Sequence, residues 1–282
     1  MTTQPRLDIS TPNTEKENSV PQTVNPMRSP DVAHIQEETQ ERLQAESEPL
    51  RTPTYEVYDL THRLRPADEQ YKLEVKERGN RTKPTGDIQS EVFLWSHVGT
   101  HFEAARHFYK DGIDTSDFSL DHGIGPAIRV DLRHKLTNEP ITVEDFQKGA
   151  ERAGGIRVGD RVFMWQGREH LYRTKHSHDR PYVTEEAAEW LINDRKIKAL
   201  GTDSSGFEVR GERATQHPLH HPFFLPGKEV PMIECMRGLG ALPRDRFFFI
   251  GMPLPVKDLD ASPIRAVALV PTDEMLATLL GI

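Results

Sequence analysis

The stretch of sequence that organises this chain runs from Ser96 to Phe108 and reads Ser-His-Val-Gly-Thr-His-Phe-Glu-Ala-Ala-Arg-His-Phe. It places three histidines and one glutamate within a dozen residues. Gly99 is a poor helix former and its two neighbours are β-branched, so the segment favours a strand that runs into a tight turn rather than a helix. Such a turn would fold His97 and His101 toward one point, with Glu103 beside them.

The residue types in this stretch predict a site for a divalent metal ion. Imidazole together with carboxylate suits Zn²⁺, Mn²⁺ or Fe²⁺ better than Ca²⁺ or Mg²⁺, which prefer shells made of oxygen alone. The plainer interpretation is that the histidines cluster by chance or pack in the core. We favour the metal site because His97, His101, Glu103 and His107 alternate with small or apolar residues.

The composition is that of an acidic chain with a polar part. The chain has 282 residues and a formal net charge of -8, which makes a nucleic-acid partner improbable. Hydrophobic residues make up 35% of it, and this low share indicates that part of the chain is not globular. The length permits one large domain or two small ones.

Redox chemistry and hydropathy indicate a cytoplasmic protein that does not enter a membrane. The single cysteine, Cys235, excludes an internal disulfide and fits a reducing compartment. No apolar run approaches the roughly 20 residues that span a bilayer. The first residues, Met1 to Arg6, lack the apolar segment of a secretory signal.

The N-terminal part differs from the rest of the chain. Residues 1–52 are rich in Thr, Pro, Asn, Gln and Glu, which predicts a flexible, disordered or extended arm. Residues 53–282 read as one domain, because no internal repeat occurs and predicted strands and helices mix along it. The predicted class is α/β without strict βαβ repetition.

The pattern of apolar residues, turns and caps predicts the elements of this domain. The segment from Pro66 to Gly86 is charged and broken by Gly and Pro, so we expect a loop there. Strands are expected at Tyr55–His62, Glu91–Trp95, Pro126–Leu132, Arg161–Trp165, Lys198–Asp203, Glu229–Glu234, Arg246–Ile250 and Pro263–Val270. Helices are expected from Thr142 to about Ala153 with a Thr142/Asp145 capping box, from Glu185 to about Asp194 with Thr184 as cap, and from Thr272 to Leu280.

A catalytic metal usually takes ligands from distant parts of the chain. The best candidates are three histidines beside prolines, His217, His220 and His221, and the acidic residue Glu234 at the end of an apolar strand. The alternative interpretation is that these are solvated surface residues. The nearness in sequence of a histidine-rich loop and a carboxylate favours ligation.

Together these residues resemble the metal-dependent cyclase/formamidase family, which includes bacterial kynurenine formamidase and isatin hydrolase. The family signature is H-x-G-T-H-x-D-x-P-x-H-F, and His97–Phe108 matches most of it. The similarity extends from about Tyr55 to Val270 and leaves out the N-terminal arm. Further matching segments are Gly125–Ala127, Gly159–Val162, Thr184–Leu191, Gly201–Ser204 and Ser262–Ala268.

The resemblance implies a fold, a ligand set and an assembly. The fold would be a single swivelling β/β/α domain with a mixed sheet, in a homodimer or homotetramer. His107 would be the catalytic general base and acid. The metal, most often Zn or Mn, would be held by His97, His101, Glu103, His220 and Glu234. The segment around the late histidine is about two residues longer than in typical members, so His217 and His221 stay open as ligands.

Two positions depart from the family signature. Glu103 stands where the family has Asp, which adds one methylene to a ligand and can alter a bridge between two metals. Ala105 replaces a proline and loosens the turn.

The implied activity is hydrolysis of an amide-type C–N bond in an N-formyl arylamine or a small cyclic amide. The metal would acidify a water and polarise the substrate carbonyl, and His107 would move the proton to the leaving nitrogen. Phe102, Trp95 and Trp165 could wall a pocket for an aromatic substrate or pack as ordinary core residues. Alternatives are a lactone hydrolase, a non-catalytic ligand-binding protein, and a thiol hydrolase centred on Cys235.

Overall fold

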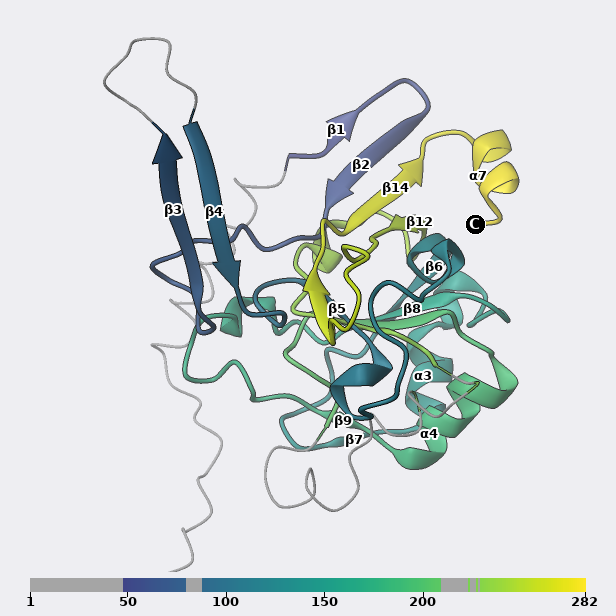
Figure 1. Cartoon of the computed structure of the whole chain (residues 1–282). Helices are drawn as coiled ribbons and strands as arrows, with labels where there is room; N and C mark the ends of the chain where they lie inside the picture. Colours follow the sequence, from purple (N-terminus) through teal and green to yellow (C-terminus); the bar gives the residue numbers. More distant parts are fainter. Residues whose placement is uncertain (1–47, 80–87, 209–222, 224–226, 228) are drawn as a thin grey trace, which may run out of the picture.

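The fold is organised around one large mixed β-sheet (Figure 1). The computed structural model describes residues 48–79, 88–208, 223, 227 and 229–282. The sheet has ten strands, and the predicted mixed α/β class is confirmed. In spatial order the strands are β1 (Leu50–Arg51), β2 (Tyr55–Asp59), β14 (Val267–Pro271), β12 (Arg246–Ile250), β6 (Ile124–Asp131), β8 (Arg161–Trp165), β10 (Ala199–Thr202), β11 (Met232–Glu234), β5 (His101–Glu103) and β13 (Ala261–Pro263).

The middle of the sheet is parallel and covered on both faces. Strands β6, β8, β10 and β11 run parallel, and all other neighbouring pairs within this ten-stranded sheet are antiparallel. Along β8, Val162 and Met164 pack with helices α3 (Val143–Gly149) and α4 (Glu185–Glu189), while Phe163 packs in the cluster on the opposite face. Strands buried on both faces read as continuous apolar runs, which is why Arg161–Trp165 was predicted with its observed bounds.

Both predicted central helices begin at their predicted caps. Thr142 and Asp145 form a reciprocal capping box at α3. Thr184 Oγ1 accepts the backbone N–H of Ala187 at the start of α4. The C-terminal part of each predicted helix is not α-helical. Residues Glu151–Ala153 form a 3₁₀ turn, and residues Trp190–Asp194 form a π-helical turn.

The loop predicted for Pro66–Gly86 is wrong over part of its length. Strand β3 (Leu73–Gly79) pairs with β4 (Ile88–Leu94) as an antiparallel hairpin that stands away from the body (Figure 1). The charges that suggested a loop lie on a ribbon open to water, where they pair with each other, as Arg78 does with Glu91 at 3.0 Å. Charge argues against burial and is compatible with an exposed strand.

The single strand predicted at Pro263–Val270 is two strands in different places. β13 is one edge of the sheet, and β14 is third from the other edge. Only residues 264–266 separate them, and so few residues span little more than 10 Å. The sheet must therefore curl until its two ends approach each other. An isolated antiparallel β-bridge joins Thr61, which follows β2, to Met236, which follows β11.

The remaining elements are short. Strand β1 includes the last residues of the predicted N-terminal arm, and residues 1–47 lie outside the described part. Within the described ranges no helix is long and apolar enough to cross a membrane. The other elements are η1 (Ala105–His107), α2 (Leu120–Gly123), η3 (Glu169–Leu171), η5 (Leu239–Ala241), α7 (Glu274–Leu280) and the parallel pair β7 (Pro140–Ile141) and β9 (Tyr182–Val183).

Thr142→Ala should lower the free energy of unfolding by about 1 kcal/mol, because it removes the cap of α3. Urea denaturation followed by circular dichroism measures this change. Thr137→Ala is the control, since Thr137 is an exposed residue in the nearby connection. Equal stability of the two variants would contradict the assigned role of the cap.

Candidate metal centre

The histidine-rich stretch forms a tight turn that leads into β5, as its sequence predicts. The turn is closed by Val98, whose N–H donates to the Trp95 carbonyl at 3.2 Å. Gly99 has a φ of +69°, and a Cβ on it would lie 2.3 Å from Leu64 Cδ2. The backbone conformation therefore favours glycine here, and a larger residue would also have to displace the Leu64 side chain. The turn brings His97 Nδ1 to 3.2 Å from His101 Nε2.

Strand pairing places two carboxylates beside these imidazoles. Side chains alternate along β5, so His101 and Glu103 share one face while Phe102 is buried in the core on the other. On the neighbouring strand β11, Glu234 is the register partner of His101. Glu234 Oε2 consequently lies 3.7 Å from His101 Nε2, and Glu103 Oε2 lies 3.4 Å from His97 Nδ1.

The hydrogen bonds of the two imidazoles leave their facing nitrogens with lone pairs. His97 Nε2 donates to Asp260 Oδ2 at 3.0 Å, and His101 Nδ1 donates to the Gly99 carbonyl at 2.9 Å. In the neutral rings, the nitrogens that face each other therefore both act as acceptors. Two facing acceptors with carboxylates next to them are suited to a cation, either a proton or a metal ion. This donor set fits Zn²⁺ or a similar divalent ion.

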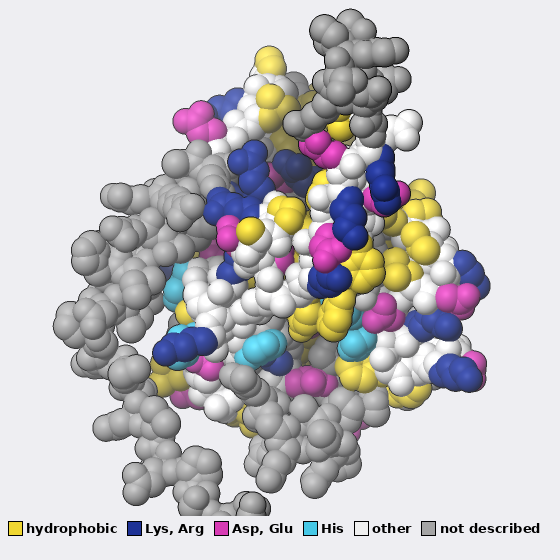
Figure 2. Space-filling view, turned by 60° about the vertical axis from the view of Figure 1, so that its left-hand side comes forward, with side chains coloured by type: hydrophobic (Ala, Val, Ile, Leu, Met, Phe, Trp, Pro, Cys, Tyr) yellow, Lys and Arg dark blue, Asp and Glu magenta, His cyan; other side chains and the backbone are white. Residues whose placement is uncertain are grey.

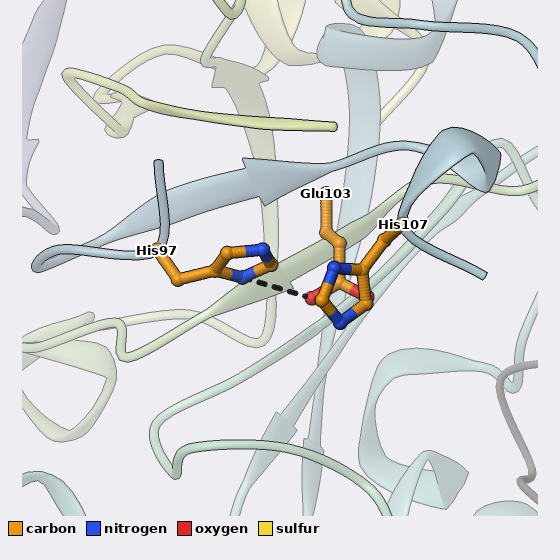
Figure 3. Close-up of side chains that lie close together, drawn as sticks. All are labelled: His97, Glu103 and His107. Carbon is orange, nitrogen blue, oxygen red and sulfur yellow. Dashed lines mark ion pairs between the residues drawn. The ribbon is translucent and has the colours of Figure 1, made fainter. Parts of the chain in front are cut away.

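Among the residues that the structure describes, two groups of side chains could each hold a metal ion, and Glu103 belongs to both. One consists of His97, Glu103 and His107, and the other of His101, Glu103 and Glu234, with ligand atoms within 4.8 Å of one another in each. Figure 3 shows the Glu103 side chain extending from β5 toward the His97 and His107 rings, with its ion pair to His97 drawn as a dashed line. The extra methylene relative to Asp lengthens the reach of this shared carboxylate.

His107 occupies the short turn η1, next to the imidazole of His97. The two ring centroids are 4.3 Å apart, and the His107 ring is more exposed than that of His101. Its Nδ1 donates to Asp260 Oδ2 at 3.1 Å. The sequence predictions missed Asp260, although it lies two residues before the matching segment that begins at Ser262.

Local charges set the protonation of these groups in the absence of a metal. Burial opposes protonation of His97, but hydrogen bonds to Asp260 and Glu103 outweigh it and raise its pKa to about 10. Burial lowers the pKa of His101. Hydrogen bonds from His107 and His97 hold the pKa of Asp260 well below its usual range. The cluster therefore attracts a positive charge to His97.

The sequence analysis also singled out three late histidines as candidate ligands and Cys235 as a candidate nucleophile. His217, His220 and His221 lie outside the described residues. Cys235 is buried, and burial raises the pKa of its thiol far above neutrality. A thiol in that state is a poor nucleophile, which argues against the thiol hydrolase alternative.

A small pocket, partly open to solvent, adjoins the histidine cluster. Its aromatic walls are Tyr71 and Tyr172, and none of the three aromatic residues considered from sequence lines it. Phe102 packs against Phe118 in the core, and Trp165 stacks with arginine side chains. Trp95 stacks on Tyr71, with ring centroids 5.8 Å apart, without lining the pocket itself. Sequence identified aromatic residues near the motif but not which face of the sheet they occupy.

The family of this chain follows from the sequence that surrounds the site. The family model named Cyclase matches residues 58–209, which include the histidine-rich turn and three of the four parallel strands, β6, β8 and β10. The chain belongs to the cyclase family. The resemblance seen in the His97–Phe108 motif is thereby confirmed.

Individual proteins similar to this cyclase-family chain include enzymes. Cyclase-like protein 1 of Arabidopsis thaliana is 25% identical over 80% of this chain and 90% of its own length. Kynurenine formamidase of Erythrobacter litoralis is 26% identical over 75% of this chain and 92% of its own length. The predicted class, a metal-dependent hydrolase of C–N bonds, agrees with the latter relative.

Solved structures show the same fold. Isatin hydrolase A from Ralstonia solanacearum superposes with a TM-score of 0.66 at 21% identity, covering 89% of this chain and all of the other. A metal-dependent hydrolase from Bacillus stearothermophilus, so named by prediction, has a TM-score of 0.60 at 27% identity over 76% of this chain and 98% of its own. The fold expected from the family resemblance is confirmed.

Binding of Zn²⁺ should release about one proton per metal ion at pH 8, because the raised pKa of His97 keeps this imidazole protonated below about pH 10. As pH falls from 9 to 7, Zn²⁺ affinity should fall about tenfold per pH unit, since the proton competes for Nδ1. Calorimetric titrations in buffers of different ionisation enthalpy measure the proton count. Binding at pH 8 without proton release would contradict this arrangement.

Proposed function

We propose that this protein is a metal-dependent hydrolase that cleaves an amide-type C–N bond in an N-formyl arylamine or a small cyclic amide. The observation that carries the proposal is the convergence of His97 Nδ1, His101 Nε2 and two carboxylates beside a third imidazole, His107. The formamidase relative supports the choice of bond. Lactone hydrolysis is the close alternative, because the same site would attack an ester carbonyl.

The proposed metal ligands are His97, His101, Glu103 and Glu234, with His220 completing the set from outside the described residues. Zn²⁺ or Mn²⁺ fits this mixture of imidazole and carboxylate. A divalent ion held there would supply an acidified water and polarise the substrate carbonyl. The buried carboxylate of Glu103, 3.9 Å from His101 Nε2 and 3.4 Å from His97 Nδ1, keeps the ligand atoms close together.

His107 is the proposed general base and acid. Its Nδ1 donates to Asp260, which leaves Nε2 to accept a proton from water. The same nitrogen then returns the proton to the leaving nitrogen, so that the amine departs neutral. An imidazole suits both steps because its ordinary pKa lies near 6.5.

The pocket beside the cluster supports an aromatic substrate. Tyr71 and Tyr172 line it together with Val98, and polar groups from Gln70 and Ser205 are placed around them. Such pockets bind small molecules through apolar walls and a few polar groups that fix orientation. The two tyrosines therefore support a small-molecule substrate that carries an aromatic ring. We place the protein in the cytoplasm, which its one unpaired cysteine supports.

His107→Ala should reduce turnover about 10²- to 10⁴-fold and leave the metal content unchanged, because it removes the base and not a proposed ligand. His101→Ala should lose both metal and turnover. Elemental analysis together with an assay on N-formyl arylamines, cyclic amides and lactones measures both quantities. His134→Ala, on an exposed imidazole that pairs with Asp145 in another part of the chain, is the control.

The wild type decides between the remaining alternatives. If purification without chelators and repletion with Zn²⁺ or Mn²⁺ leave it free of metal, the protein is a non-catalytic ligand-binding member. If it holds metal but hydrolyses only lactones, the fold and metal centre are retained and the proposed bond type is wrong.

We also propose that the protein forms a homodimer or homotetramer. Strand β4 is exposed along its whole length, and the hairpin presents several large apolar side chains to solvent. Figure 2, in which the hairpin comes forward, shows apolar side chains gathered beside its row of charged ones. A two-stranded ribbon is marginally stable alone, and an exposed apolar patch marks a contact surface. The exposed apolar residues of the hairpin and of the position that follows it are Val75, Ile88, Val92, Phe93, Leu94 and Trp95.

Val92→Asp combined with Phe93→Asp should convert the wild-type oligomer into a monomer of 32.2 kDa, because it places charges in the proposed contact. Light scattering coupled to size exclusion measures the mass. The control is Leu279→Asp, a similar change at an exposed apolar residue of α7. A wild type that is already monomeric would refute the proposed assembly.

A further inference from the structure

We propose that Asp260 is a positioning residue that holds the metal ligand His97 and the general base His107 with one carboxylate oxygen. This inference rests on the proposed function, because it assigns Asp260 a part in both metal binding and proton transfer. It concerns a residue outside the histidine-rich motif, more than 150 positions further along the chain.

The geometry shows one acceptor shared by two donors. Asp260 Oδ2 lies 3.0 Å from His97 Nε2 and 3.1 Å from His107 Nδ1. An ionised carboxylate can only accept, so each imidazole must carry a hydrogen on the nitrogen that faces it. Asp260 therefore selects opposite tautomers in the two rings, with the hydrogen on Nε2 in His97 and on Nδ1 in His107.

These tautomers are the ones that the proposed chemistry requires. With its hydrogen on Nε2, neutral His97 presents the lone pair of Nδ1 toward Glu103 and His101. With its hydrogen on Nδ1, His107 keeps the lone pair of Nε2 for a proton from water. The Asp260 oxygen contacts the opposite nitrogen of His97 from the one that faces Glu103, so it supports this ligand from behind. Carboxylates in this position orient metal-binding histidines and raise their basicity.

The backbone holds Asp260 in place independently of the histidines. Its carbonyl accepts the Ala104 N–H at 2.8 Å, and the next residue begins β13, which pairs with β5. Two residues before Asp260, the backbone N–H of Asp258 donates to Asp114 Oδ2 at 2.7 Å. The loop that carries Asp260 is thus fastened to the strand that carries His101 and Glu103. The carboxylate is preorganised before any metal binds.

Asp260 is not needed to fill the core. About a third of its side chain is exposed, at 34%, so truncation creates no buried cavity. Truncation of the Asp260 side chain should therefore change the orientation of the two imidazoles more than the free energy of unfolding. Asp258 lies on the same loop, and its carboxylate pairs with Arg106 at 3.2 Å rather than with a histidine, which makes it a matched control.

The first test is Zn²⁺ affinity, measured by competition with a chelator. Asp260→Ala should weaken binding about 10- to 100-fold, as loss of a carboxylate behind a histidine ligand does. Asp260→Asn should have a smaller effect, because its amide oxygen can still accept. Asp258→Asn should change affinity less than twofold. Wild-type affinity in Asp260→Ala, with Zn²⁺ bound in both proteins, would overturn the role toward His97.

The second test observes the tautomers directly and needs no substrate. Proton–nitrogen correlation spectra of protein labelled at histidine nitrogens should show His107 with its hydrogen on Nδ1 in the wild type and in Asp258→Asn. In Asp260→Ala this signal should change to the Nε2 tautomer or to a mixture. A His107 spectrum that is the same in Asp260→Ala and the wild type would overturn the role toward His107.

The third test is a double-mutant cycle on turnover at saturating Zn²⁺. Asp260→Ala should lower kcat at least tenfold in the wild-type background and less than twofold in His107→Ala, because the two residues act in one step. Equal losses in both backgrounds would overturn the coupling. Zn²⁺ binding and tautomers that depend on Asp260, without turnover of any amide, would refute the proposed function and leave this inference standing. Metal-dependent turnover that is unchanged in Asp260→Ala would support the proposed function and refute this inference.

Discussion

The close approach of His97 Nδ1 and His101 Nε2 is the constraint on which the site depends. Each ring donates its hydrogen elsewhere, to Asp260 and to the Gly99 carbonyl, so two lone pairs face each other. A positive charge between or beside these nitrogens is needed to stabilise this arrangement. Two nearby carboxylates supply the compensating negative charge. The fold thus builds a local environment that favours a cation, and the raised pKa of His97 reflects the same field acting on a proton.

Strand β5 carries this arrangement because it is short and held on both edges. It pairs with β11 on one side and with β13 on the other. The first pairing delivers Glu234 opposite His101, and the second begins beside Asp260. Three segments distant in sequence therefore meet on three adjacent strands. The backbone hydrogen bonds between these strands fix the register, and the register holds the side chains within hydrogen-bonding distance of one another. The curl of the sheet brings the following segment back to β14 without disturbing this pairing.

Much of the fold could be predicted from local pattern. The bounds of β8, the capping box at Thr142 and the cap at Thr184 depend on neighbouring residues, and all were predicted. Strand β3 was missed because its charges are also typical of a loop, whereas its partner β4 overlaps the strand predicted at Glu91–Trp95. The division of the last predicted strand was missed because the apolar pattern does not record which sheet position a strand occupies.

The sequence by itself determined the turn, since Gly99 between β-branched residues cannot favour a helix, and it determined the donor chemistry, since imidazoles and a carboxylate recur within one short motif. It also carried the family signature. Only the tertiary structure decided that Asp260 lies behind His97 and His107, and that Glu103 belongs to both candidate ligand groups. The reason is physical: spacing along the chain specifies neighbours within a turn, whereas contacts across strands depend on register and sheet curvature, which many distant residues set together.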